Sequence, residues 1–364
     1  MFDYRHYVPV LRWKRAEWVA LRNLTPQTRA GMTPLVEITP RGFEPEDPDC
    51  GMNLDKKLPR HAERIAENWG NGRLFLDLSL LDPRVRTTSG EHPLVVLFNA
   101  GRLKGLSMVP VTGFSQGWAY QEAVRDVADD DGQGVCVRIR KDDLTRAGLA
   151  RELNDLLVGL RVSRNEVDLV VDLGFASDSG PGAESIAGRL QAIDEWRSFT
   201  VVAGALPKDL TGFSVGQHLV ARTEWKWWVA ELAAQTGRRT RMPTFGDYTI
   251  QHHIFSEPQA GMNVSASIRY TTPDHWLVLR GEGLRNKNSS GYAQYPASAQ
   301  LLSGQKEFCG PDYSYGDDYI YKMGSQQSST TGSPETWLRA GINHHLTFAV
   351  RQIGQTLDLP VGEA

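Results

Sequence analysis

The feature that most constrains the fold of this chain is a series of eight short apolar runs along its first 250 residues. Each run is rich in Val, Ile, Leu and Phe, which is typical of parallel strands that are buried on both faces. The starts of successive runs lie about 33 residues apart on average, which is the size of a strand, a helix and two loops. The runs cover residues 8–14, 33–39, 73–80, 107–114, 134–140, 167–174, 199–206 and 242–250.

Segments with helical spacing separate these runs, so the pattern predicts eight βα units. Eight units favour an α/β fold of the (β/α)8 TIM-barrel type, whereas six or fewer would favour an open doubly wound sheet. No G-x-G-x-x-G motif follows the first run, which argues against a dinucleotide-binding fold. We therefore predict that residues 1–364 form a single barrel domain.

The last third of the chain departs from the repeat. Two strand-like runs around the turn at 271–274 predict a hairpin, and the Gly-, Ser- and Tyr-rich residues after it predict an irregular insertion with a few short helices. Hairpin and insertion together cover 265–333. Ser333 as N-cap, followed by Pro334, predicts a helix over 333–355, which we assign as the delayed last helix of the barrel.

Composition excludes several classes of protein. The chain has 40 Lys plus Arg against 43 Asp plus Glu, a net charge of −3, so it has no overall basic field. Its three cysteines fit neither a disulfide framework nor a zinc site, which favours a reducing cytoplasm. No apolar stretch is long enough for a membrane helix. We expect a cytoplasmic protein with no membrane association.

Charged residues recur late in the apolar runs, where the mouth of a barrel lies. Charges inside strands are costly unless they are paired, hydrated or bound to a ligand. One interpretation is an internal salt-bridge network that closes the barrel. The other is a pocket for an anionic or zwitterionic small molecule. The residues concerned are the acids Glu37, Asp77, Asp172 and Asp247 and the bases Lys14, Arg138 and Arg140.

Metal and cofactor chemistry receive little support from the sequence. Four acids suit a divalent cation, but the chain lacks H-x-H, H-E-x-x-H or a compact Asp cluster, so we predict no metal site and leave the cofactor open. Lys14 stands where some barrel enzymes place a Schiff-base lysine, although an ion-pairing lysine is the simpler interpretation. The adjacent pairs His252–His253 and His344–His345 should diverge, so a surface or capping role is expected for them.

Several of these runs together resemble one family. The stretch Val8–Lys14, the segments around Glu37 and Asp172, the sequence Phe245–Tyr248 and the run Trp276–Gly281 are similar to the beta protein family, named after a protein of a T-even phage. The resemblance covers nearly the whole chain and adds Tyr248 and Arg280 to the candidate ligand-binding residues. It assigns no reaction and no catalytic residue.

The resemblance implies a role rather than a chemistry. It points to a component of a phage–host conflict locus, in defence or in a mobile element, with a nuclease-like protein from the same locus as the partner and a charged pocket at the barrel mouth. The alternative is an enzyme acting on a phosphorylated or nucleotide-like small molecule, with or without the assistance of a metal ion. Whether the chain is an enzyme stays open.

Duplex DNA is not an expected partner. The richest basic cluster of the chain, at 238–241, contains three arginines, and acids match the basic residues elsewhere. We expect this cluster to be a solvated helix end, where cations interact favourably with the helix dipole. Tight binding of duplex DNA by the chain alone is therefore not expected.

Overall fold

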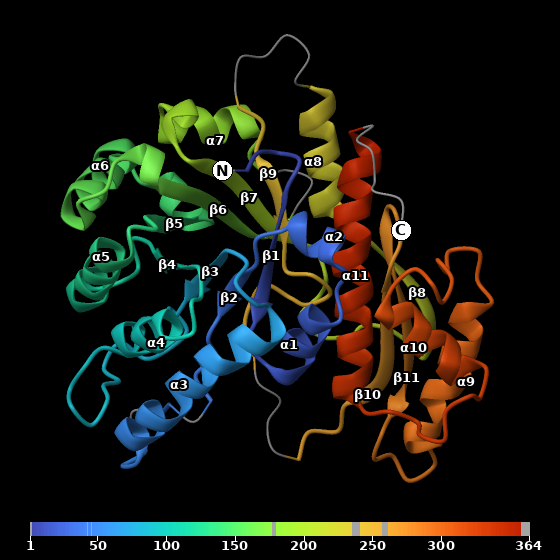
Figure 1. Ribbon diagram of the computed structural model, residues 1–364. Coiled ribbons are helices and arrows are strands. Elements are labelled where there is room, and N and C mark those ends of the chain that lie inside the picture. Colours follow the sequence, from blue (N-terminus) through green and yellow to red (C-terminus); the bar gives the residue numbers. More distant parts are fainter. Residues whose placement is uncertain are drawn as a thin grey trace.

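Eight parallel strands close into a barrel in the computed structural model of the chain, which describes residues 2–41, 43–44, 46–176, 180–234, 241–256 and 261–357 (Figure 1). Each strand falls on one of the eight apolar runs, and the predicted fold class is confirmed. The barrel strands are β1 (Tyr7–Arg12), β2 (Leu35–Glu37), β3 (Leu74–Asp77), β4 (Met108–Thr112), β5 (Val135–Arg140), β6 (Val167–Phe175), β7 (Ser198–Gly204) and β9 (Thr244–Asp247).

Helices follow the strands and form the outer layer of the barrel (Figure 1). They are α1 (Arg15–Arg22), α2 (Pro26–Ala30), α3 (Cys50–Asn68), α4 (Pro93–Arg102), α5 (Trp118–Asp131), α6 (Leu149–Leu160), α7 (Ala183–Leu190), α8 (Thr223–Ala233) and α11 (Pro334–Thr356). The aromatic face of α8 packs on the barrel as its i, i+3 spacing predicts, with Trp225 and Trp228 buried against Phe245. None of the helices in the described ranges is long and apolar enough to cross a membrane.

The inside of the barrel is built in three levels. Its middle is apolar and includes Val10, Phe75 and Val170. At the amino ends of the strands, the buried carboxylate of Asp168 pairs with Arg73 (3.0 Å) and Arg197 (2.6 Å). A second ionic level lies at the carboxyl ends and is described below. A packed interior of this kind is typical of an eight-stranded barrel, which has no open pore.

A separate C-terminal unit lies beside the barrel (Figure 1). It comprises the antiparallel sheet β10–β11–β8, made of Ser265–Thr271, His275–Gly283 and Gly216–Ala221, together with α9 (Gln294–Ser303) and α10 (Tyr315–Gly324). The sheet contains the hairpin expected from the sequence, but the apolar-run pattern missed β8. The unit has its own apolar core, which includes Ile268, Leu279 and Trp337.

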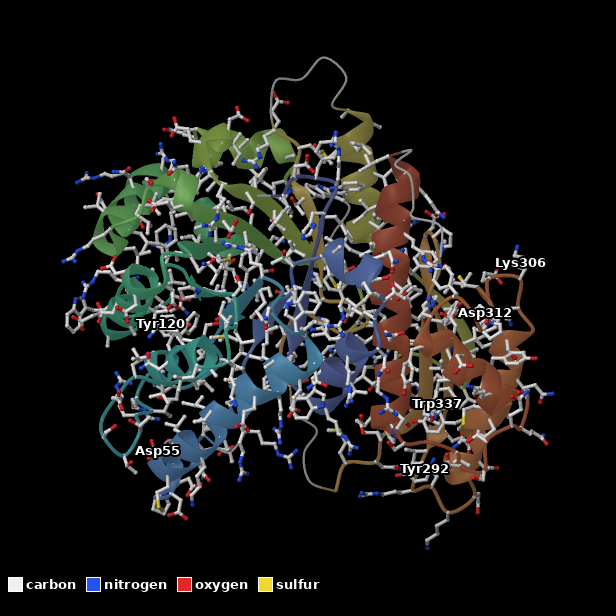
Figure 2. All side chains as sticks on the ribbon, in the orientation of Figure 1. Asp55, Tyr120, Tyr292, Lys306, Asp312 and Trp337 are labelled. Carbon is white, nitrogen blue, oxygen red and sulfur yellow. The ribbon has the colours of Figure 1, made fainter. Side chains whose placement is uncertain are left out.

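Helix α11 lies between the barrel and the C-terminal unit. It packs against α1 on the barrel side and against β10 and α10 on the other side. Ser333 caps it by accepting a hydrogen bond from the Thr336 amide (3.3 Å). Figure 2 shows Trp337 on the side of α11 that faces the C-terminal unit. One helix thus serves both cores.

Candidate functional site

Arg138 is the centre of the ionic level at the barrel mouth. Its strand position on β5 points inward, because side chains two apart along a strand share a face and Cys136 belongs to the interior. The Arg138 side chain is 3% exposed. Its NH1 donates to Glu37 and to Asp77, both at 2.8 Å, while Nε and NH2 donate to Asp172 at 3.0 and 2.8 Å.

Tyr248 completes this network. Its hydroxyl accepts a hydrogen bond from Arg138 NH2 (2.8 Å) and donates one to Asp172 (2.7 Å). A guanidinium has five N–H donors, and these five contacts use all of them. Arg138 therefore has no donor left for a ligand. Burial alone would lower its pKa, but the surrounding Tyr248 and carboxylates raise the pKa well above its ordinary value.

Two further arginines balance the charge of the network. Arg12 is buried, and its Nε lies 3.5 Å from Glu37. Arg140 NH1 lies 3.7 Å from Asp172, and its side chain is 44% exposed. Three guanidiniums thus face three carboxylates. Burial would raise the pKa of Asp172, but Arg138, Tyr248 and Arg140 hold it below the ordinary aspartate value.

The backbone around Asp172 also depends on one glycine. Gly174 has a φ of +65°, a left-handed conformation that favours glycine, and its N–H donates to Asp172 Oδ1 (3.0 Å). A Cβ on this residue would lie 3.1 Å from the His253 ring. Glycine at this position therefore allows the backbone N–H of residue 174 to reach the Asp172 carboxylate. It also leaves room for the His253 ring, which belongs to the segment after β9.

A cavity of about 560 Å3 opens above the network. Glu37, Asp172 and Tyr248 form its floor, and Arg140 and Lys141 contribute cations and Asp142 a carboxylate to its wall. Phe175, His253, Ile254 and Phe255 give it an apolar and aromatic rim. Burial and the neighbouring His252 lower the pKa of His253 to about 4, so its imidazole is neutral at pH 7. We call this space the mouth cavity.

Three of the predicted site residues do not lie inside the barrel mouth. Asp247 precedes the inward-facing Tyr248, so its side chain points outward, where it bonds to His345 (2.9 Å) and Tyr7 (2.5 Å). Arg280 lies on β11 in the C-terminal unit and donates to the Phe213 carbonyl. Lys14 lies at the edge of the mouth, with its ammonium 4.6 Å from the Phe255 ring centre.

The expectation for the second histidine pair was wrong. His344 and His345 are both completely buried, and each pairs with an aspartate, Asp317 and Asp247 respectively, at 2.9 Å. The two side chains do diverge, as adjacent residues must, but α11 is covered on both sides. A surface role was expected because the sequence does not show that a second unit packs on this helix.

The residues of the mouth do not fit a divalent cation. Glu37, Asp77 and Asp172 already share the guanidinium of Arg138, which occupies the centre of the carboxylate cluster. Asp247, the fourth acid, faces the other side of the sheet. Within the described ranges, no group of three or more His, Cys, Asp or Glu side chains is arranged to hold a metal ion. Glu37, Asp77 and Asp172 form ion pairs with the arginines of the mouth.

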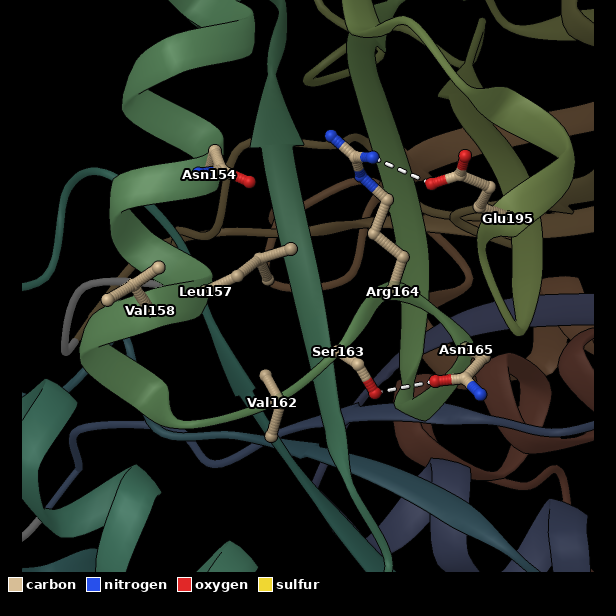
Figure 3. Close-up of a pocket in the computed structure, with 8 residues that line it drawn as sticks. All are labelled: Asn154, Leu157, Val158, Val162, Ser163, Arg164, Asn165 and Glu195. Atoms are coloured by element: carbon tan, nitrogen blue, oxygen red, sulfur yellow. Dashed lines mark hydrogen bonds and ion pairs between the residues drawn. The ribbon is translucent and has the colours of Figure 1, made fainter.

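A second hollow lies at the opposite end of the barrel (Figure 3). Its volume is about 510 Å3, and it lies between the end of α6 and the residues that precede β6. Its polar groups pair with each other, as in the contact of Arg164 with Glu195 at 2.7 Å. Functional sites of barrels lie at the carboxyl ends of the strands, so we do not assign a function to this hollow.

The fold and the mouth together define a (β/α)8 barrel protein with an apolar interior and a buried ionic network at each end. A family model described as beta protein matches residues 7–351. The chain belongs to the beta protein family, as the resemblance of its strand segments indicates. None of the curated proteins matches it.

Solved structures with some similarity are distant. Two mutants of the tryptophan synthase α-subunit from the hyperthermophile Pyrococcus furiosus share 9% identity with a TM-score of 0.38, covering 68% of this chain and 89% of theirs. The D-psicose 3-epimerase with D-tagatose from Clostridium cellulolyticum H10 shares 13% identity with a TM-score of 0.29, covering 70% of this chain and 87% of that one. We draw no functional argument from them.

Proposed function

We propose that the mouth cavity binds a small organic anion, with Arg140 as the anion contact and the Arg138 network as a rigid floor. The observation that carries this proposal is the contrast between the two arginines. Arg138 uses all five donors inside the network, whereas Arg140 is 44% exposed and has one ion pair, at 3.7 Å, among the described residues. An arginine with unused donors suits a carboxylate or phosphate.

The rim of the cavity narrows the class of ligand. Phe175, Ile254 and Phe255 border it, so the ligand should carry a planar or apolar part beside its anionic group. A nucleotide-like molecule meets both requirements. The paired side chains of the Arg138 network are already ordered, so a ligand that binds above them loses less conformational entropy in immobilising side chains.

The test uses adenosine monophosphate as the probe and neutral adenosine as its control. A probe present at about 100 times its dissociation constant stabilises a protein by about 2.7 kcal/mol, which is visible as a rise in the unfolding midpoint. We expect this rise with the monophosphate for the wild type and for Arg151→Ala, an exposed arginine elsewhere. Arg140→Ala should abolish it. A wild type that responds to neither probe, or equally to both, would contradict the proposal.

An enzyme acting on such a molecule is the second candidate, and His253 is the observation that favours it. Its neutral imidazole borders the mouth cavity, and its Nδ1 has no hydrogen-bond partner in the described structure. A neutral imidazole can accept a proton, and a ligand anion beside it would have to raise its pKa from about 4 for it to act as a base near pH 7. If the chain releases phosphate from the probe, His253→Asn should stop the release without preventing binding. Binding without turnover would leave the barrel as a binding protein.

The place in a phage–host conflict locus, with a nuclease-like partner, rests on the resemblance and is also a proposal. The observation that favours a partner is β8, an edge strand of its sheet with Leu219 62% exposed. Exposed edges can pair with a strand of another chain. Co-purification with the protein encoded beside this one, reduced by Leu219→Asp and unaffected by Arg151→Ala, would support it. Failure of that protein to co-purify would contradict it.

A further inference from the structure

A third cavity lies between the barrel mouth and the C-terminal unit. Its volume is about 280 Å3. The segment after β9 separates it from the mouth cavity, and Ile254 lines both spaces. Four cationic side chains contribute to its lining, and the described lining residues include no aspartate or glutamate. We call this space the cationic groove, and its cations are Arg12, Lys14, Lys208 and Arg269.

Strand β10 supplies the polar wall of the groove. Side chains two apart on a strand share a face, and Ser265, Ser267 and Arg269 alternate with the buried Ala266 and Ile268. The buried set belongs to the core of the C-terminal unit. The other set therefore turns two hydroxyls and a guanidinium toward the barrel.

Arg269 is the most informative of the four cations. It is partly buried, yet among the described residues its side chain makes a single hydrogen bond, from NH1 to the Ile250 carbonyl (2.8 Å), and no ion pair. Burial without a nearby acid lowers its pKa below the ordinary arginine value. A guanidinium has five donors, so most of those on Arg269 are not used by the described protein groups. A positive charge in this position favours an anion.

The remaining walls add to the positive potential. Arg12 is 6% exposed and lines the groove, although its charge is partly balanced by Glu37, 3.5 Å from its Nε, and its NH2 donates to the His253 carbonyl (2.7 Å). Lys208 is exposed at the opening. The first turn of α11, with Pro334 and Trp337, also borders the groove, and the amino end of a helix carries a partial positive charge.

We propose that the cationic groove binds the phosphate group of a small phosphorylated molecule. Arginine forks, lysine ammonium groups and serine hydroxyls are all donors to phosphate oxygens. The site is recessed between two packed units, which suits a small molecule and excludes a duplex. This site is separate from the mouth cavity, and the two are tested with different probes and different variants.

Inorganic pyrophosphate is the probe for the groove, measured by calorimetry at about 150 mM salt, where the Debye length is about 8 Å and diffuse attraction is largely screened. We expect Arg269→Gln to weaken binding by at least about tenfold, because hydrogen bonds to charged groups contribute that much. The matched control is Arg285→Gln. Arg285 lies in the same unit, is exposed and also donates to a backbone carbonyl, that of Gly261.

A second variant keeps the test decisive if Arg269→Gln fails to fold. Ser267→Glu places a negative charge on the same face of β10 at a partly exposed position, so it should abolish binding while the unfolding midpoint stays close to that of the wild type. Arg140→Ala should bind pyrophosphate like the wild type. The proposal is overturned if the wild type does not bind, if Arg285→Gln loses as much affinity as Arg269→Gln, or if Ser267→Glu still binds.

Discussion

Arg138 shows why an ionic group can lie inside this barrel at all. It is fully paired, and an equivalent arrangement at the other end, around Asp168, closes the amino face where no reaction is expected. Both networks replace the hydration that their charges lose on burial. The structural interpretation therefore applies to Arg138, and the ligand proposal moves to the more exposed Arg140.

The first prediction follows from this division. Arg138→Ala leaves Glu37, Asp77 and Asp172 buried with no central cation, and removing one partner of a buried pair costs about 3–5 kcal/mol. Urea unfolding should show this loss. Arg140→Ala and the control Arg151→Ala, at 89% exposure, should stay within about 0.5 kcal/mol of the wild type. Wild-type stability of Arg138→Ala, combined with lost ligand binding, would instead make Arg138 part of a ligand site.

For single residues, the sequence predicts which charged side chains lie near the barrel mouth better than it predicts which of them point into the barrel. Glu37, Asp77, Arg138 and Asp172 were expected to meet, and the period of two along a strand is the reason they do. The same period of two applies to Asp247 and Tyr248. Because they are neighbours on the chain, only one of them can face the barrel interior. That Arg138 has no donor left could not be predicted, since its partners come from three different strands and from Tyr248, which follows β9.

Among the elements, α11 connects the two packed units through its adjacent histidines. Successive helical residues diverge by about 100°. His345 thus reaches the barrel through Asp247, and His344 reaches the C-terminal unit through Asp317. Tyr270 stacks on His344 with ring centres 3.8 Å apart and donates to Asp317 (2.7 Å). These buried contacts couple α11 to β10 and α10.

The second prediction concerns Asp317 and pH. Burial would raise its pKa, but His344, Ser314 and Tyr270 hold it below the ordinary 3.8. A carboxyl with a lowered folded pKa contributes stability that is present above its unfolded pKa and is lost as pH falls through its folded pKa. Asp317→Asn should cost about 1.5–3 kcal/mol at pH 7, the range for hydrogen bonds to charged groups.

Urea unfolding as a function of pH checks this prediction. The difference between Asp317→Asn and the wild type should shrink as the pH falls below about 4. Asp318→Asn is the control, because its exposed carboxylate pairs only with Lys322 (2.7 Å) among the described residues. A constant difference across the pH range would show that the variant acts through packing and not through the charge of Asp317.

The elements of the barrel were predictable because buried parallel strands are nearly continuous apolar runs. Strand β8 was missed for the opposite reason. Its residues are exposed or half-buried, so Gly216–Ala221 has no apolar run, and its partner β11 begins at His275, far along the chain. The core of the C-terminal unit was hidden by the Gly- and Ser-rich composition of the segment that supplies α9 and α10.

For the whole molecule, positive and negative charges are nearly equal in number, and many of the described cations form ion pairs with acids. The net charge is −3, and many surface arginines pair with acids, as Arg84 and Arg146 do. The cationic groove joins residues from 12 to 338, a juxtaposition that only the folded chain creates. It is recessed, so it does not provide the continuous basic face that a duplex requires.

The last prediction is that the chain alone does not bind duplex DNA tightly. Of the basic cluster at 238–241, Arg238 and Arg239 lie outside the described residues, while Arg241 donates to the carbonyls of Trp196 (2.5 Å) and Arg197 (3.3 Å). Arg241 thus binds the protein backbone, and this leaves fewer cations for phosphates. Anisotropy titration at about 150 mM salt should give no binding tighter than about 10⁻⁶ M. Submicromolar binding that disappears when the three arginines become alanine would reveal a nucleic-acid surface that includes this cluster.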